Sequence, residues 1–189
     1  MTSPVSVGGD ERLRLFLALR VPDDALDAID RWRRKELGGA PRLVPREHLH
    51  VTLAFLGHRP AGELPAIVDA LRAAAASSRE IRLAAGRYRE TRSVGMLVLE
   101  DEQGRATALA EDLQERLERL GVYEREGRGW LPHLTVARWR ERPRLRPGPP
   151  PERTFVPSDA AAYLSRLRPG GAEYRVLEAV ALGARVGGE

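Results

Sequence analysis

The sequence predicts an α+β fold of two pseudo-symmetric lobes that face each other across a central cleft, and two observations favour it. Residues 49–57 read LHVTLAFLG, and a reduced copy, PHLTVAR, returns at residues 132–138. Each copy follows a predicted strand and a predicted helix at nearly the same distance along the chain. A duplicated unit of strand, helix and His-x-Thr strand is expected to build two similar lobes related by a pseudo-twofold axis.

The first half of the chain contains the elements that this repeat requires. Residues 13–19, LRLFLAL, form a short apolar run that is typical of a buried strand. Acidic residues directly after Pro22 and a glycine pair at 38–39 mark the two ends of a helix. After the first His-x-Thr strand, apolar residues at near-helical spacing predict an amphipathic helix over residues 64–77.

The second half repeats the pattern. Residues 81–88 and 95–100 are predicted strands, and residues 104–120 a predicted helix. Four leucines should form the buried stripe of that helix: Leu109, Leu113, Leu117 and Leu120. The second His-x-Thr strand follows this helix, so the order of elements matches the first half.

The last part of the chain departs from the repeat. Residues 140–153 are rich in proline and arginine, which excludes a helix or a central strand. Residues 160–167 and 174–182 are predicted to pair as a hairpin across a Pro-Gly-Gly turn. We therefore expect one bilobal domain over residues 12–189, preceded by a flexible tail over residues 1–11.

The two His-x-Thr motifs are the candidate functional site. Since side chains alternate along a strand, each motif should carry its histidine and threonine on one face and apolar residues on the other. The expected cleft face holds His50, Thr52, His133 and Thr135; the opposite face holds Leu49, Val51, Leu53, Phe55, Leu134 and Val136. An imidazole beside a hydroxyl, offered twice, predicts an acid/base pair with hydrogen-bond donors for one anionic substrate.

Other polar residues near the motifs are weighed against this site. A metal site is disfavoured because His50 and His133 have no third ligand at a suitable spacing. His48 and His58 lie close enough to the first motif to touch substrate, but both are predicted to be surface residues. Arg138 is a candidate phosphate ligand, but strict alternation puts it on the face away from His133, so a twist or bulge is needed to bring it into the site.

The composition narrows the possible partners and compartment. The 189 residues include no cysteine, which excludes disulfides and thiol nucleophiles and fits a reducing cytoplasm. The net charge is +4 and the positive groups are almost all arginine, with Lys35 the sole lysine. Arginine binds phosphate through two parallel hydrogen bonds, so a polyanionic partner fits, although base composition of the genome alone would also favour arginine over lysine. No 18-residue apolar run is present, so no membrane span is expected.

Taken together, these motifs resemble the 2H phosphoesterase superfamily, and specifically the RNA 2′,3′-cyclic phosphodiesterases that are also called 2′-5′ RNA ligases. The similarity runs from RLFLALRVPDDAL through LHVTLAFLG and PHLTVAR to YLSRLRPGGAEYRVLEAVAL. It implies antiparallel strands with helices outside, no cofactor, and cleavage of a 2′,3′-cyclic phosphate to a 2′-phosphate. It also implies that His50 is the proton donor, that His133 is the proton acceptor, and that Thr52 and Thr135 bind the phosphate.

The resemblance defines the expected partner and leaves alternatives open. The expected substrate is RNA with a 2′,3′-cyclic phosphate end, tRNA fragments included, acted on by a cytoplasmic monomer without metal. One alternative is a 2H enzyme that acts on small cyclic nucleotides or 2′-5′ linked oligonucleotides. Another is a noncatalytic module that binds RNA ends. The intact histidine pair favours an enzyme, because binding alone has no need of two proton carriers.

Overall fold

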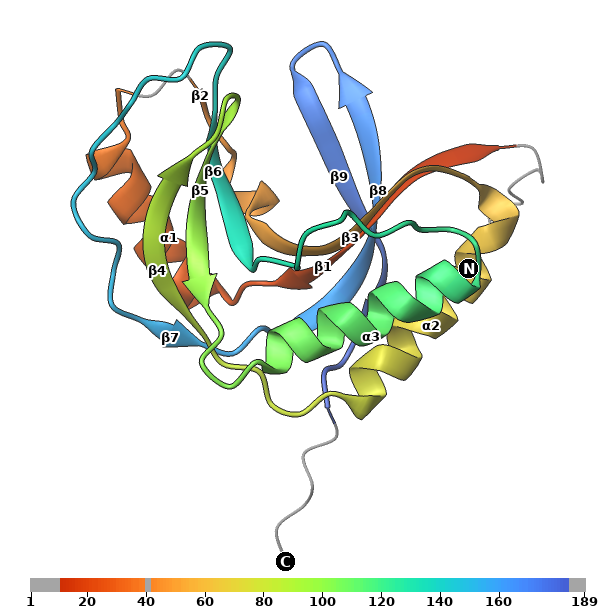
Figure 1. Cartoon of the computed structure of the whole chain (residues 1–189). Coiled ribbons are helices and arrows are strands. Elements are labelled where there is room, and N and C mark those ends of the chain that lie inside the picture. The colour runs from red at the N-terminus through yellow and green to blue at the C-terminus, as the bar shows by residue number, and fades with distance from the viewer. Residues whose placement is uncertain (1–10, 40–41, 184–189) are drawn as a thin grey trace, which may run out of the picture.

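The computed structural model describes residues 11–39 and 42–183 (Figure 1). The expected N-terminal tail therefore lies outside the described residues, apart from Glu11. Three helices, two 3₁₀ turns and nine strands occur in the described part. Their order is β1 (Arg12–Arg20), α1 (Asp23–Glu36), β2 (Arg42–Leu43), η1 (Arg46–His48), β3 (His50–Pro60), η2 (Ala61–Glu63), α2 (Leu64–Ser77), β4 (Leu83–Glu90), β5 (Val94–Glu100), α3 (Arg105–Arg119), β6 (His133–Arg138), β7 (Thr154–Phe155), β8 (Asp159–Arg168) and β9 (Gly171–Val180).

The strands form one sheet that is almost divided in two. Its order is β7-β4-β5-β6-β3-β1-β8-β9, with β2 also paired to β6, and every pairing is antiparallel. The pairing between β3 and β6 is limited to Val51 and Leu134, whereas the neighbouring pairs run over many residues. The sheet therefore separates into a β3-β1-β8-β9 lobe and a β6-β5-β4-β7 lobe, as the α+β two-lobe prediction requires.

The helices cover the outer faces of the two lobes (Figure 1). Two of them, α1 and α3, each pack on the lobe whose motif strand comes from the other half of the sequence. Helix α1, from the first half, packs on the second lobe: the ring of Trp32 lies 6.3 Å from that of Tyr88 on β4. Helix α3, from the second half, packs on the first lobe, where the Gln114 amide donates to the Leu53 carbonyl at 2.8 Å. The halves are thus interleaved, and neither lobe is built from one half alone.

The predicted elements are confirmed, although one residue of the predicted α3 stripe is not buried. The terminal hairpin, the helices and the buried strand β1 lie within a few residues of their expected positions. Leu109, Leu113 and Leu117 of α3 are buried, as predicted. Leu120 is 45% exposed, so its place in the stripe was wrong. The reason is that α3 ends at Arg119, and the chain leaves the helix axis at Leu120 and Gly121, whose φ is positive.

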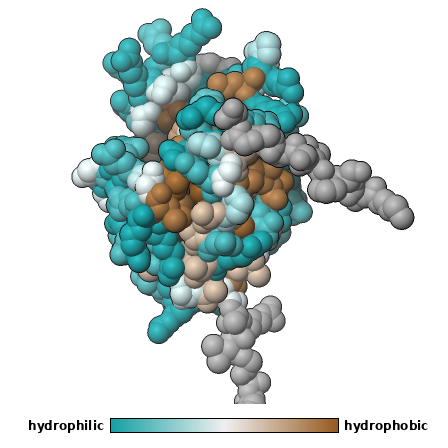
Figure 2. Space-filling model, turned by 90° about the vertical axis from the view of Figure 1, so that its right-hand side faces the viewer, coloured by the Kyte–Doolittle hydropathy of each residue, from teal (hydrophilic) through white to brown (hydrophobic). Residues whose placement is uncertain are grey.

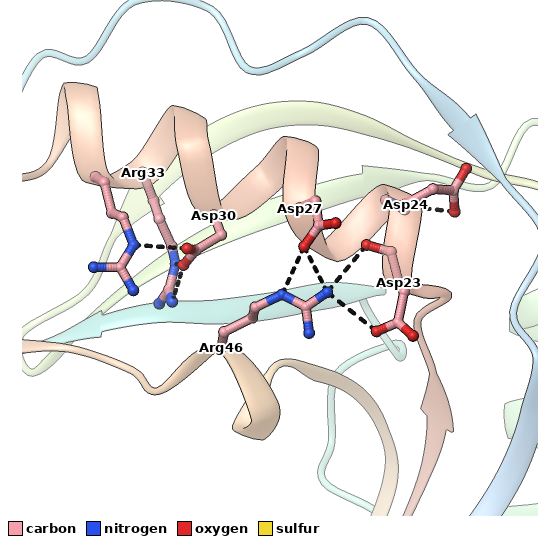
Figure 3. Close-up of polar contacts among 8 residues, drawn as sticks. Asp23, Asp24, Asp27, Asp30, Arg33 and Arg46 are labelled. Carbon is pink, nitrogen blue, oxygen red and sulfur yellow. Dashed lines mark hydrogen bonds and ion pairs between the residues drawn. The ribbon is translucent and has the colours of Figure 1, made fainter.

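Polar residues of α1 hold the segment that precedes β3 and also contact β6 (Figure 3). Arg46, in the 3₁₀ turn before β3, donates to Asp27 at 2.6 Å and to Asp23 at 3.1 Å. Arg33 is 1% exposed, pairs with Asp30 on its own helix, and donates to the carbonyl oxygens of Val44 and Val136. One helix therefore anchors both the approach to β3 and the middle of β6.

The proline and arginine tract after β6 is irregular, as predicted, and wraps around α1. Glu90, at the end of β4, accepts hydrogen bonds from the Arg142 side chain and from the backbone of Leu145. Further along, Gly148 bonds to Trp32 and Glu36 of α1. The tract thus fastens α1 to the second lobe.

The outer surface carries no single continuous hydrophobic stripe on the side viewed in Figure 2, where hydrophobic side chains occur in small separate groups among hydrophilic ones. Within residues 11–39 and 42–183, no helix is long and apolar enough to cross a membrane.

Candidate active site

The two His-x-Thr motifs line one cleft between the lobes. His50 and Thr52 come from β3, and His133 and Thr135 come from β6. All four line a cavity of about 260 Å³. The antiparallel pairing of Val51 with Leu134 sets the two motifs side by side with their polar residues on one face. The prediction that the motifs share a cleft is therefore confirmed.

Both histidines are held by the same local hydrogen bond. Nδ1 of His50 lies 2.7 Å from the His48 carbonyl oxygen, and Nδ1 of His133 lies 2.8 Å from the Leu131 carbonyl oxygen. A carbonyl oxygen only accepts, so Nδ1 must carry a proton in each ring. The neutral form of each ring then has its lone pair on Nε2, which is the nitrogen left for proton transfer.

The surroundings of the two rings differ. His50 stacks on Phe16 at 4.7 Å between ring centroids and meets the edge of Tyr174 at 5.6 Å. Burial in this aromatic packing lowers the pKa of His50 to about 4, against which the hydrogen bond to the His48 carbonyl has a smaller, opposite effect. His50 is thus uncharged near neutral pH when the cleft holds no anion.

Arg138 lies in the cleft because β6 contains a bulge. The register with β5 passes from Thr135 opposite Met96 to Ala137 opposite Gly95, so Val136 is the extra residue. The bulge reverses the alternation after Thr135, and Arg138 joins the lining of the cavity. The sequence pattern required a twist or bulge to bring Arg138 into the site, and the bulge at Val136 provides it.

A second bulge corrects the predicted position of Phe55. In β3 the register with β1 skips Leu53, since Thr52 faces Ala18 and Ala54 faces Leu17. Leu49, Val51 and Leu53 are buried as predicted, but Phe55 is 49% exposed and lines the cleft. Its place on the apolar face was wrong, because the bulge reverses the side-chain alternation between Thr52 and Phe55.

Sequence reasoning also missed several residues of the cleft. His48, predicted as a surface residue, lines the cavity with its ring 4.5 Å from Tyr174, because η1 turns it toward β9. His58 is exposed and outside the cavity, as predicted. Arg14 and Arg42 enter from β1 and β2. Arg14 could have been found from the sequence, because it interrupts the apolar run of residues 13–19. The sequence around Arg42 gives no such indication that this residue lies in the cleft.

The cleft has the electrostatic character of an anion site. Its three arginines are Arg14, Arg42 and Arg138, and its described lining includes no carboxylate. Arg14 donates to Ser165 at 2.5 Å and lies over the ring of Phe55 at 4.7 Å, which leaves other N–H groups of the guanidinium for a ligand. Arg42 donates to the Gly170 carbonyl in the β8–β9 turn. None of residues 139–153 lines this cleft.

The described residues hold no group of three or more His, Cys, Asp or Glu side chains arranged to bind a metal ion. The cleft lining offers two imidazoles suited to proton transfer, with hydroxyl and guanidinium donors for an anion.

Comparison with known proteins agrees with this geometry. The family model described as "2'-5' RNA ligase superfamily" matches residues 21–168. The chain belongs to this superfamily, which is a group of 2H phosphoesterases. The superfamily assignment confirms the resemblance that the motifs carry, and it covers both His-x-Thr strands.

Two curated relatives and one solved structure illustrate the similarity of this 2H phosphoesterase. An "RNA 2',3'-cyclic phosphodiesterase" of Geobacillus stearothermophilus is 30% identical over 68% of this chain and 42% of its own length. A protein of the same name from Methanocaldococcus jannaschii is 23% identical over 67% of this chain and 71% of its own length. The crystal structure of E. coli LigT complexed with 3′-AMP superposes with a TM-score of 0.79 at 26% identity, over 91% of this chain and 99% of LigT.

Proposed function

We propose that this 2H phosphoesterase hydrolyses the 2′,3′-cyclic phosphate ends of RNA to 2′-phosphomonoesters. The observation that carries the proposal is the pair of histidines around one cleft, each with Nδ1 bonded to a carbonyl and each beside a threonine. The names of the two curated relatives support a phosphodiesterase acting on such ends, and the 3′-AMP bound to LigT supports a nucleotide ligand.

The proposed reaction uses the cleft residues in distinct roles. His133 takes a proton from water through Nε2 while the water oxygen attacks phosphorus. The bond from phosphorus to O3′ breaks on the opposite side, and His50 gives a proton to O3′. The product keeps its phosphate on O2′ and has a free 3′-hydroxyl. Thr52, Thr135 and Arg138 donate to the phosphoryl oxygens as negative charge develops.

The proposed donor role of His50 requires that this ring is protonated when substrate is bound. Because the pKa of this ring is about 4 in the empty cleft, His50 must gain a proton when the anionic phosphate arrives. A phosphate anion beside the ring favours the protonated form and therefore raises its pKa. The three arginines of the cleft attract the phosphate anion, and the negative charge of the anion then raises the pKa of His50 so that this ring can act as the acid.

The expected setting follows from composition as well as from the site. We propose a monomer that acts in the cytoplasm on RNA ends, tRNA fragments included. The lack of cysteine fits a reducing compartment. Sedimentation equilibrium tests the monomer, and fractionation of cells that express the tagged protein tests the compartment.

One experiment separates this function from its alternatives. The protein is incubated with a 2′,3′-cyclic mononucleotide and with an oligonucleotide that ends in the same cyclic phosphate. Turnover of the oligonucleotide at the higher kcat/KM is expected. Binding of both without turnover indicates a noncatalytic RNA-end module, and a preference for the mononucleotide indicates an enzyme of small cyclic nucleotides.

A further inference from the structure

A second cavity adjoins the catalytic cleft on the side of His133. This side cavity has a volume of about 780 Å³ and shares Thr52, Phe55 and His133 with the cleft. Small-molecule sites typically measure about 300–1,000 Å³, so the side cavity falls within that range and the cleft, at about 260 Å³, falls below it. A nucleotide with its phosphorus between the histidines therefore needs the adjoining space for its base.

The two spaces differ in charge. The cleft is lined by three arginines and by no carboxylate of the described chain. The side cavity has two of each sign: Glu126 pairs with Arg128 at 2.7 Å, and Glu124 and Arg89 also contribute to its walls. It is also lined by Trp130, Tyr123 and Met96. The cleft thus suits a phosphate, and the side cavity suits a neutral, flat, polar-edged group.

Gln114 of α3 indicates which polar edge the side cavity accepts. This side chain is 6% exposed, lines the cavity, and uses its amide N–H on the Leu53 carbonyl oxygen. Within the described residues no hydrogen bond to its carbonyl oxygen is found, and no unpaired side-chain oxygen there is fully buried, so this oxygen has access to a ligand. The Gln114 carbonyl oxygen and the Glu124 carboxylate, which lines the same cavity, both accept hydrogen bonds, so the matching ligand presents N–H donors.

The covalent structure of the ribose connects these two spaces. C3′ is bonded to C4′, which carries the 5′ chain, and C2′ is bonded to C1′, which carries the base. When O3′ faces His50, the 5′ chain extends toward the His50 end of the cleft and the base extends toward the His133 end. That orientation puts the base in the side cavity and points the 5′ phosphodiester toward the end of the cleft that holds Arg42 and Arg138, in agreement with the charge of the two spaces.

We propose that the side cavity binds the terminal base of the RNA end and selects a base with an exocyclic amino group, while Arg42 binds the 5′ phosphate of the same nucleotide. The proposal rests on the hydrolysis proposed above. Cytosine, adenine and guanine carry such an amino group. Uracil presents a carbonyl oxygen instead, which would face the acceptors Gln114 and Glu124 without a proton between them.

The base site is tested with cytidine and uridine 2′,3′-cyclic phosphates, which have the same size. We expect kcat/KM to favour cytidine by about tenfold, the effect of roughly one hydrogen bond. Gln114→Leu should bring the ratio close to one, and the matched variant Glu115→Gln, on the exposed face of α3, should keep the wild-type ratio. If Gln114→Leu does not fold, as judged by circular dichroism, Glu124→Gln gives the same test and should lower the ratio by about twofold.

The phosphate site is tested with cytidine 2′,3′-cyclic phosphate with and without a 5′-phosphate. The 5′-phosphate should raise kcat/KM by about tenfold through charge-assisted hydrogen bonds. Arg42→Gln should remove this gain and leave the cytidine-to-uridine ratio as in the wild type. Arg175→Gln, an exposed arginine of β9 outside the cleft, is the matched control and should keep the gain.

Three results would overturn the inference. The first is hydrolysis of cytidine and uridine 2′,3′-cyclic phosphates at equal kcat/KM by the wild type. The second is a ratio that neither Gln114→Leu nor Glu124→Gln changes. The third is a base preference that moves with Arg42→Gln, which would put the base on the arginine side. Lack of turnover on every cyclic phosphate would instead refute the proposed hydrolysis, on which this inference rests.

Discussion

At the scale of single residues, the two motif histidines have the same backbone anchor and different packing. Both rings donate from Nδ1 to a carbonyl two residues earlier, so both have Nε2 for the reaction. Only His50 is enclosed by Phe16 and Tyr174. The two copies of the motif thus place their imidazoles in different surroundings, and the proposed reaction likewise gives the two rings different roles.

Replacement of either histidine by alanine should lower kcat by about 10²- to 10⁴-fold, the usual contribution of positioned proton transfer. Thr52→Ala and Thr135→Ala should cost less, since each removes one donor among several. The measurement is steady-state hydrolysis of a cyclic dinucleotide end, with thermal melting to check the fold. His58→Ala, an exposed residue outside the cleft, is the control. Near-normal turnover by the His133 variant would refute the mechanism.

Stability should depend on pH through His50. Its folded pKa is about 4, against about 6.5 in an unfolded chain, so the unfolded state binds a proton that the folded state does not bind between these values. The stabilisation is complete above pH ~6.5 and decreases as the pH falls toward 4; at pH 5 the loss is about 2 kcal/mol. Urea unfolding at pH 7.5 and pH 5 measures it. His50→Gln should lose less over this interval, and an identical loss in both proteins would exclude the assignment.

Hydrolysis should be independent of metal ions, because the proposed mechanism moves protons between imidazoles, water and O3′. Prolonged dialysis against a chelator should leave kcat unchanged. A chelated protein that is inactive and recovers with added zinc would point to a metal-activated hydroxide instead. The same chelated sample can be used for the pH-rate profile, which should be bell-shaped, with two limbs that report the histidine pair.

At the scale of elements, α1 is the support of the site. Its buried Arg33 reaches the carbonyls of Val44 and Val136, and Asp30 provides the balancing charge. Burial alone would raise the pKa of Asp30, but hydrogen bonds from Arg34 and Arg33 together hold it below its usual value. The Asp30 carboxylate is therefore ionised at neutral pH and balances the charge of the buried Arg33.

Asp30→Asn should destabilise the fold by about 3 kcal/mol, because it leaves the Arg33 guanidinium buried without an opposite charge. Asp69→Asn is the control: this aspartate also pairs with an arginine at i+3, but its side chain is 73% exposed. Its loss should stay within about 1 kcal/mol. Urea unfolding of both variants at pH 7.5 gives the comparison. Equal losses would mean that burial of Arg33 does not set the cost.

The elements also show what the sequence could and could not predict. Helices, strands and the faces of the motif residues follow from local periodicity, so the patterns predicted them. The bulges at Leu53 and Val136 depend on partner strands, and they decide the positions of Phe55 and Arg138. Arg42 reaches the cleft because β2 pairs with β6, far away in sequence. The packing of α1 on the second lobe and of α3 on the first also depends on contacts between residues far apart in the sequence, so local patterns could not predict it.

At the scale of the whole molecule, the active site depends on how the two lobes meet. The pairing of β3 with β6 is limited to Val51 and Leu134, and each lobe supplies one His-x-Thr motif. Across the top of the cleft, Arg42 of one lobe donates to the Gly170 carbonyl of the other at 2.6 Å. The site is therefore symmetric in its histidines and asymmetric in its surroundings, with Arg42 and Arg138 toward the His50 end and a side cavity that adjoins the cleft at Thr52, Phe55 and His133.

In the proposed binding mode this asymmetry orients the substrate, and the orientation would decide the product. In-line attack requires water and the leaving oxygen on opposite sides of phosphorus, so the histidine that faces O3′ is the acid. With the 5′ chain at the arginine end, O3′ faces His50 and the phosphate stays on O2′. Phosphorus NMR of the product from a cyclic-phosphate dinucleotide should therefore show mainly the 2′-phosphate, which resists an enzyme selective for 3′-phosphates. A mainly 3′-phosphate product would mean that the substrate lies reversed in the cleft, and that His133 is the donor and His50 the acceptor even if both histidines prove essential.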